Sequence, residues 1–150
     1  MIRKAKISDI DIIHGILLRF AEKDMLIPRS RSELYDQLRD FSVYEDEEGG
    51  FAGCVALHIT WKDLAEIRSL AVIEEQQGRG IGRKLVESAL SEAVTLGICR
   101  VFTLTNQSEF FEKLGFKEVD KSTLPHKVWS DCLKCTKFPD CDEIAYLMEL

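Results

Sequence analysis

The sequence predicts a mixed α/β fold in which one sheet carries helices on both faces. Its 150 residues are 45% hydrophobic and 31% charged, which is typical of a folded, soluble globular domain. Segments with helical and strand-like patterns follow one another in the order ααββ(β)αβαβ…β. At the centre, a strand, a long amphipathic helix and another strand are consecutive, which favours helices packed on a sheet. Because no repeat, low-complexity stretch or linker interrupts the chain, we expect a single domain over residues 1–150.

Two amphipathic helices are expected before the first strand. Ser8 can cap the first helix, and Ser32 is expected to open the second, shorter one. Apolar residues recur at steps of three and four positions in both. They are Ile10, Ile13, Ile16, Leu17 and Phe20 in the first, and Leu34, Leu38 and Phe41 in the second. Residues 42–45 are expected to be extended, and the acidic run before Gly49-Gly50 predicts a hairpin turn.

The rest of the chain combines strands with one long helix. Apolar, partly alternating patterns predict strands at 51–59 and 64–72. The strongest helical pattern covers 80–96 and ends at Gly97. Its apolar stripe consists of Ile81, Leu85, Ala89, Ala93 and Leu96. Further on we expect a strand at 100–104, a short helix at 108–114, a strand at 116–119 and a last strand in which Ile144, Tyr146 and Met148 alternate.

Charge and hydropathy exclude two broad classes of partner. Lys and Arg total 20 against 26 Asp and Glu, and the resulting net charge of −6 argues against non-specific binding of nucleic acid. A local cluster of amides and cations could still hold a small anionic ligand. No stretch approaches the roughly 20 apolar residues that a membrane span needs, and the start shows no secretory signal. We therefore expect a cytoplasmic protein without a membrane partner.

The cysteines are expected to be reduced. Five are present, an odd number, and a chain of this size does not need a disulfide framework. Cys132, Cys135 and Cys141 lie close together near His126, so zinc and a disulfide are alternatives to packed thiols. Because no second pair of ligands completes a familiar zinc spacing, packed thiols are favoured and no metal is expected.

A glycine-spaced loop opens the long helix and predicts an anion site. Gly78, Gly80 and Gly82 lack Cβ atoms, so backbone N–H groups can approach a ligand closely. The helix start adds unpaired N–H groups and a positive dipole end, which suit a pyrophosphate. Cationic side chains flank the glycines: Arg79, Arg83 and Lys84. The run lacks the Gly-Lys-Ser/Thr of the phosphate-binding P-loop, and its third glycine comes one residue early for a dinucleotide fingerprint. A plain flexible turn is the alternative interpretation.

Three motifs in order resemble the GNAT N-acetyltransferase superfamily. Residues 77–82, Gln-Gly-Arg-Gly-Ile-Gly, match the Gln/Arg-x-x-Gly-x-Gly loop that binds acetyl-CoA in that family. Residues 66–72 are similar to its central strand, and 110–116 to its Phe-Tyr-Glu-Lys-Leu-Gly-Phe signature. The resemblance implies a mainly antiparallel mixed sheet whose central strands splay apart at a bulge near Leu70 to admit the cofactor.

The resemblance also implies a donor site and a catalytic base. Acetyl-CoA, as co-substrate, would be bound by Leu70, Ala71, Val72, Gln77, Gly78, Arg79, Gly80, Ile81, Gly82, Arg83 and Phe111. The backbone of 70–72 would pair with the pantetheine arm and polarise the thioester carbonyl. Glu66 matches the family's general base, which takes a proton from the attacking amine; the alternative is that it merely pairs with Arg68.

One position departs from the family pattern. Many relatives carry a tyrosine at the position of Phe111, and its hydroxyl protonates the departing thiolate. Phenylalanine has no such proton, so the general acid is left open, and water is one source because a thiolate is a tolerable leaving group near neutral pH. Phe111 is expected to pack against the cofactor edge or in the core.

A more specific resemblance suggests the acceptor. Residues 26–31 are similar to the Leu-Val-x-Arg-Ser-Arg segment of the GNAT domain of N-acetylglutamate synthases, as are 124–125 and 129–135 to later segments. Those enzymes acetylate the α-amine of L-glutamate at the start of arginine biosynthesis, and their amino-acid-kinase domain has no counterpart in these 150 residues. Glutamate carries two carboxylates, which need cations when buried. The candidate cations are Arg29, Arg31, Arg68 and Lys127, with Arg29 the first choice.

Three further possibilities stay open from the sequence. The same chemistry could act on another amine, such as a different amino acid, a polyamine or a protein amino terminus. A non-catalytic acyl-CoA-binding sensor is an alternative prompted by Phe111. The resemblance also suggests a homodimer, because tail strands in this superfamily often pair between subunits.

Overall fold

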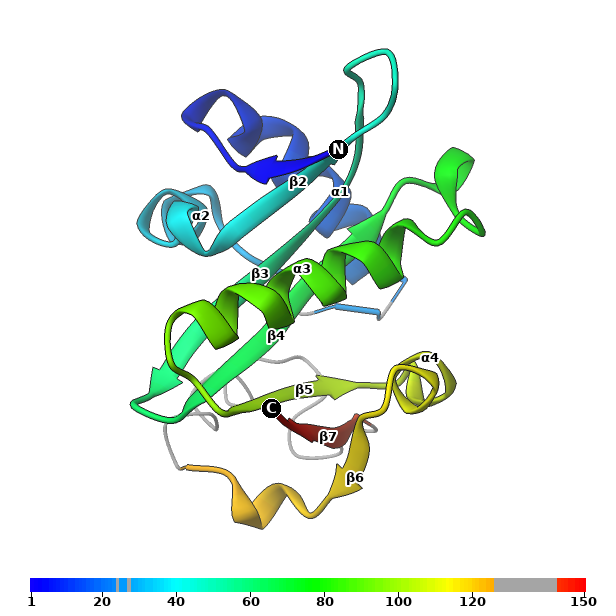
Figure 1. Cartoon of the computed structure of the whole chain (residues 1–150). Helices are drawn as coiled ribbons and strands as arrows, with labels where there is room; N and C mark the ends of the chain where they lie inside the picture. Colours follow the sequence, from blue (N-terminus) through cyan, green and yellow to red (C-terminus); the bar gives the residue numbers. More distant parts are fainter. Residues whose placement is uncertain (24, 27, 126–142) are drawn as a thin grey trace.

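A twisted, mainly antiparallel sheet organises the protein (Figure 1). The computed structural model describes residues 1–23, 25–26, 28–125 and 143–150. Within them the sheet has seven strands in the order β1-β2-β3-β4-β5-β7-β6. The strands are β1 Ile2–Lys4, β2 Phe41–Glu45, β3 Phe51–Trp61, β4 Leu64–Val72, β5 Arg100–Thr105, β6 Lys117–Val119 and β7 Ile144–Glu149. Neighbours pair antiparallel except β4 and β5, which are parallel. The predicted mixed sheet is confirmed.

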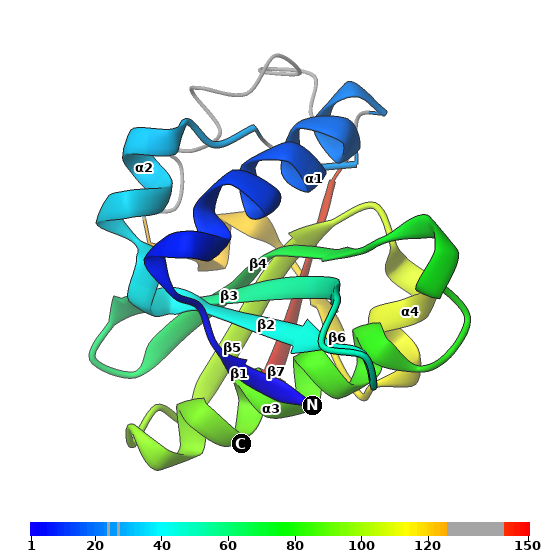
Figure 2. The ribbon, with the colours of Figure 1, turned by 90° about the horizontal axis from the view of Figure 1, so that it is seen from above.

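Helices cover both faces of the sheet, as expected (Figure 2). The α-helices are α1 Ile10–Glu22, α2 Arg31–Asp36, α3 Ile81–Thr95 and α4 Ser108–Lys113. Alternate residues of β3 serve the two faces, as the two-residue period of a strand requires. Cys54 and Ala56 pack with α1 and α2, whereas Val55 and Leu57 pack with α3. No helix in the described ranges has both the length and the apolar character that crossing a membrane requires.

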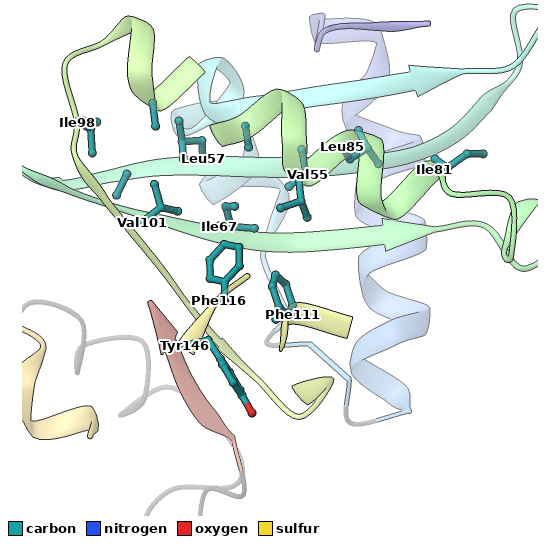
Figure 3. Close-up of a cluster of buried hydrophobic side chains, with 14 of the residues drawn as sticks. Val55, Leu57, Ile67, Ile81, Leu85, Ile98, Val101, Phe111, Phe116 and Tyr146 are labelled. Atoms are coloured by element: carbon teal, nitrogen blue, oxygen red, sulfur yellow. The ribbon is translucent and has the colours of Figure 1, made fainter. Parts of the chain in front are cut away.

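The core between α3 and the sheet follows the predicted helical stripe with one exception (Figure 3). Ile81, Leu85, Ala89 and Ala93 are buried there, together with the sheet residues that face them. Leu96, expected in the same stripe, is 54% exposed. The helix ends at Thr95, and Leu96 is its C-cap residue just before Gly97, whose φ of 82° favours glycine. A residue at that turn no longer shares the buried face.

The first strand and the first cap differ from expectation. β1 was not predicted, because three residues are too few to show a pattern. Ser8 does not cap α1: it lies inside a 3-10 turn, Ile7–Asp9, that leads into the helix. The Asp9 carboxylate instead accepts a bond from the backbone N–H of Lys6 at 2.7 Å and a bidentate pair from Arg3. Because Arg3 is bound so closely, it lowers the pKa of Asp9.

The second helix begins earlier than predicted. Its N-cap is Ser30 and not Ser32, and the Ser30 hydroxyl accepts a bond from the backbone N–H of Glu33 at 3.1 Å. Glu33 reaches back to the backbone N–H of Ser30, which completes a capping box. The spacing of a serine and a glutamate three residues later marks this start in the sequence.

The two central strands splay apart, as the resemblance implied. The β4–β5 ladder ends at the pair Glu66–Phe102, although β4 continues to Val72 and β5 to Thr105. Just beyond the last pair, the Thr103 hydroxyl donates a hydrogen bond to the Ile67 carbonyl oxygen at 2.8 Å. This side-chain bond satisfies the Ile67 carbonyl where the β4–β5 ladder has ended. Strand pairing is thus replaced by an opening between β4 and β5.

A bulge in β4 accompanies this opening. The register with β3 passes from Cys54–Ala71 to Ala56–Arg68, so β4 holds one residue more than its partner. Ser69, inside this stretch, has a φ of 56°, which non-glycine residues rarely adopt. The bulge predicted near Leu70 is confirmed, and a bulge of this kind bends the strand beside the opening.

Gly53 marks a close approach of β3 to the end of β4, and its substitution should destabilise the fold. A Cβ atom at Gly53 would lie 2.8 Å from the Ala71 carbonyl oxygen, a backbone atom that cannot swing away. We expect Gly53→Ala to lower the free energy of unfolding by about 1–3 kcal/mol, measured by urea denaturation. Gly15→Ala is the matched control: nothing lies within 4 Å of its added Cβ on α1, so a gain of about 0.5–1 kcal/mol is expected. Equal stability of the two variants would contradict this view of Gly53.

Candidate active site

A cavity of about 450 Å³ occupies the opening between β4 and β5. One wall consists of β4 residues from Glu66 to Val72 and the other of β5 residues from Thr103 to Thr105. The start of α3 closes one part of it, and Phe20, Met25, Leu26 and Arg29 come from the end of α1 and the chain after it. A concave, partly apolar site with a few polar groups is the usual form of a small-molecule site.

The loop before α3 has the geometry expected of an anion cradle. Gly78 and Gly80 have φ values of 81° and 79°, the left-handed region that favours glycine. Nothing lies within 4 Å of a Cβ added at either, so backbone conformation and not crowding requires them. The first helical hydrogen bond of α3 runs from Lys84 N to Gly80 O at 3.1 Å. The preceding N–H groups of the first turn therefore lie before the helical ladder and suit an anionic ligand.

Most of the residues predicted to bind the donor line this cavity. They are Leu70, Val72, Gln77, Gly78, Gly80, Ile81, Gly82, Arg83 and Phe111. Gln77 also closes the loop, because its side-chain amide donates to the Val72 carbonyl at 3.0 Å. Gly82 has an ordinary backbone conformation, and its Cβ would make van der Waals contact with Phe110.

Three predicted residues lie differently. The Ala71 side chain is buried on the α1 face, so any role of Ala71 falls to its backbone. Arg79 is at the surface, where it donates to Gln76 at 3.1 Å. Lys84, expected to add charge at the anion site, places its ammonium 6.0 Å from the centre of the Tyr44 ring. Of the three cations predicted at this loop, Arg83 lines the cavity and the other two do not.

Glu66 is buried at the point where the two strands part. It belongs to the last β4–β5 pair, lines the cavity and is 8% exposed. Its Oε1 lies 3.5 Å from Nη1 of Arg68, two residues further along the same strand. Glu66 thus pairs with Arg68 and also lines the cavity, a position that fits the predicted general base, which stays a prediction.

Of the three cations predicted for the acceptor that the structure describes, Arg29 and Arg68 line the cavity. Arg29 is 7% exposed, and its Nη1 lies 3.5 Å from Oε2 of Glu33. The Arg68 side chain is 9% exposed. Arg31 lies elsewhere, at the surface in an ion pair with Asp11 at 3.1 Å. Lys127 lies outside the described residues, as do His126 and the cysteines at 132, 135 and 141.

Phe111 packs in the core (Figure 3). It also lines the cavity. Its ring makes edge-to-face contacts with Phe110 and Phe116, at centroid distances of 5.0 and 5.3 Å. Both expected roles of Phe111 thus fit its position. Among the cavity-lining residues that the structure describes, no tyrosine, histidine, cysteine or lysine is present. The described ranges also contain no cluster of side chains suited to a metal ion.

Several lining residues were not expected from the sequence. Phe20 was assigned only to the helical stripe, and Met25, Gln107 and Glu143 were not singled out. Phe20 ends the apolar stripe of α1, and Gln107 is the N-cap of α4, two residues after β5. Met25, Gln107 and Glu143 lie within three residues of the end or start of a helix or strand, and such a position beside a cleft is the signal that could have identified these three.

Comparison with known proteins identifies relatives of the whole chain. The family model of the acetyltransferase (GNAT) domain matches residues 37–118. A protein from Chlorobaculum tepidum called an uncharacterized N-acetyltransferase is 41% identical over 99% of this chain and 96% of its own length. An amino-acid acetyltransferase of Mycobacterium tuberculosis is 36% identical over 87% of this chain and 76% of its own length.

A solved structure resembles the fold closely. N-acetylglutamate synthase from Neisseria gonorrhoeae, complexed with coenzyme A and N-acetyl-glutamate, superimposes with a TM-score of 0.91 at 30% identity. The match covers all of this chain and 35% of the synthase chain, so this protein spans about a third of that enzyme.

Proposed function

The chain belongs to the GNAT family of acetyltransferases and is an acetyl-CoA-dependent N-acetyltransferase; on this premise we propose that it acetylates the α-amine of L-glutamate. The observation that carries the proposal is that the buried Arg29 and the largely buried side chain of Arg68 line the cavity that also holds Glu66. Burial of a dicarboxylate requires cations, and guanidinium groups bind carboxylates in two-point contacts. The gonococcal synthase, crystallised with N-acetyl-glutamate, supports the same acceptor.

The loop and strand flanking the cavity would hold the donor. Backbone N–H groups of residues 77–83 suit the pyrophosphate of acetyl-CoA, with Arg83 adding positive charge. The strand end 70–72, released from pairing with β5, has backbone groups available for the pantetheine arm. An amide aimed at the thioester oxygen would stabilise the negative charge that develops there.

Glu66 would serve as the general base. The ammonium form of an amine has no lone pair for attack, so a proton must leave before the new C–N bond forms. A carboxylate in the cavity can accept it directly or through one water. The bond from carbonyl carbon to sulfur then breaks, the sulfur leaves with the electron pair, and the nitrogen loses a second proton to solvent, which leaves a neutral amide. Because Phe111 cannot protonate it, the thiolate takes its proton from water or from a protonated carboxyl group.

Release of CoA from the purified protein tests the acceptor. We expect turnover with L-glutamate to exceed that with other amino acids, since Arg29 and Arg68 can engage both carboxylates. The assay follows free thiol across a panel of L-glutamate, L-glutamine, L-aspartate, L-lysine and spermidine. A rate with spermidine and none with glutamate would overturn the proposal in favour of a polyamine acceptor.

Two wider expectations rest on this acceptor or on the family. If L-glutamate is acetylated, the protein would supply the first step of arginine biosynthesis, in the cytoplasm. The homodimer expected from the resemblance stays a prediction, which the solution mass by light scattering would check.

A further inference from the structure

Arg68 is held by a residue from a different part of the chain. Its Nη2 donates to the side-chain oxygen Oε1 of Gln37 at 2.8 Å, while its Nη1 lies 3.5 Å from Glu66. Gln37 lies 31 positions before Arg68 and was not singled out by the sequence analysis. One guanidinium therefore connects the N-terminal helices to the base that lines the cavity.

The backbone of Gln37 is fixed on both sides. It is the C-cap of α2, where its N–H donates to the Glu33 carbonyl at 2.9 Å. Its own carbonyl accepts from Asp40 N at 2.9 Å as the chain turns into the 3-10 segment Leu38–Asp40. Leu34, fully buried in the core beneath α1, anchors the helix. A side chain on such a support can hold Arg68 in one place.

The chemistry of the amide matters as much as its position. The Gln37 oxygen is neutral, so it satisfies guanidinium N–H groups without cancelling their positive charge. The 3.5 Å separation between Arg68 and Glu66 is longer than the 2.7–2.9 Å of a close charge-assisted hydrogen bond. A carboxylate at position 37 would give the cluster of residues 37, 66 and 68 a net negative charge, which would repel an anionic acceptor.

We propose that Gln37 is a positioning and specificity-determining residue, which holds Arg68 where it lines the cavity and adds no negative charge beside the acceptor carboxylate. The inference rests on the proposed use of a carboxylate-bearing amine. The new element is that binding of this amine requires a neutral hydrogen-bond acceptor at position 37. Gln37 is not among the described residues that line the cavity, and it acts through Arg68, which does line it.

Two substitutions at position 37 distinguish the effect of losing the contact with Arg68 from the effect of adding a negative charge beside it. Gln37→Ala removes the contact and should raise the KM for L-glutamate about 5- to 10-fold. Gln37→Glu keeps an oxygen acceptor but adds a charge, and should raise it about 10- to 100-fold, the loss expected of one charge-assisted hydrogen bond. In both variants the KM for acetyl-CoA should stay within twofold, because the donor loop is untouched. Asp36→Ala, the exposed neighbour on α2, is the control and should leave both constants unchanged.

The outcomes distinguish this inference from the acceptor assignment. Thermal unfolding of each variant first establishes that it folds, and equilibrium titration with L-glutamate in the presence of CoA measures binding without turnover. Wild-type turnover on glutamate with an unchanged glutamate KM and affinity in Gln37→Glu would overturn the role of Gln37 alone. Wild-type protein that acetylates spermidine and no amino acid would overturn both proposals. A rise in the KM for acetyl-CoA equal to that for glutamate would indicate a general structural role and also contradict the inference.

Discussion

Replacing Glu66 by glutamine is expected to lower kcat by about 10²- to 10⁴-fold, the usual contribution of a general base. The amide keeps the size and the hydrogen-bonding oxygen of the side chain, so Arg68, 3.5 Å away, retains a polar partner. It cannot accept a proton at neutral pH, and attack by the amine slows. Binding of acetyl-CoA should stay within about twofold of wild type, because the donor loop at 77–83 lies further along the chain from Glu66.

Steady-state CoA release measures kcat, and calorimetric titration with acetyl-CoA separately measures the affinity for the donor. Glu118→Gln is the matched control: this glutamate also lies in the sheet, on β6, but is exposed and does not line the cavity. A kcat for Glu66→Gln within a few-fold of wild type would show that another group, or water alone, removes the proton.

Replacing Arg29 by methionine is expected to raise the KM for L-glutamate about 30-fold or more. Arg29 is 7% exposed and lines the cavity, so its loss removes one of the two cations proposed to bind the acceptor's two carboxylates. Truncation of one partner in such a pair typically costs about 2–5 kcal/mol. Arg29→Lys keeps the charge but loses the two-point geometry, and an intermediate KM is expected.

Arg31 offers a control two residues away. The same sequence motif suggested both arginines, but Arg31 pairs with Asp11 at the surface with 58% of its side chain exposed. We expect Arg31→Met to leave the KM for glutamate within twofold. Equal kinetic effects of the two substitutions would contradict the assignment of Arg29, and thermal unfolding of each variant identifies any loss of folding.

Local features of this site were predictable because short segments of chain determine them. The glycine loop that opens α3 is one example: positive φ at Gly78 and Gly80 is a property of the residues themselves. The strand at Leu64–Val72 was predicted at its full extent for a similar reason, since its pattern and its flanking residues are local. The start of α2 was missed although its capping box is also local, because Ser32 was chosen over Ser30.

Contacts between distant segments could not be predicted from periodicity. One motif suggested both Arg29 and Arg31, with Arg29 preferred, but the motif places neither side chain; the packing of α1 and α2 on the sheet decides that Arg29 reaches the cavity. The contact between Gln37 and Arg68 has the same origin, because it joins a helix end to a strand. Lys84 was predicted to add charge at the glycine loop because it is close to that loop in sequence. In the structure its ammonium instead lies over the ring of Tyr44 on β2.

The sequence by itself determined the class of fold and predicted the glycine loop as the donor site and Glu66 as the base, because each depends on a short motif or a periodic pattern. Tertiary structure alone decided where β4 and β5 part, which arginines lie within the resulting cavity, and which residue holds Arg68. The reason is physical. Local conformation follows from the dihedral preferences of neighbouring residues, whereas a site assembled from distant segments follows from how their apolar faces pack together.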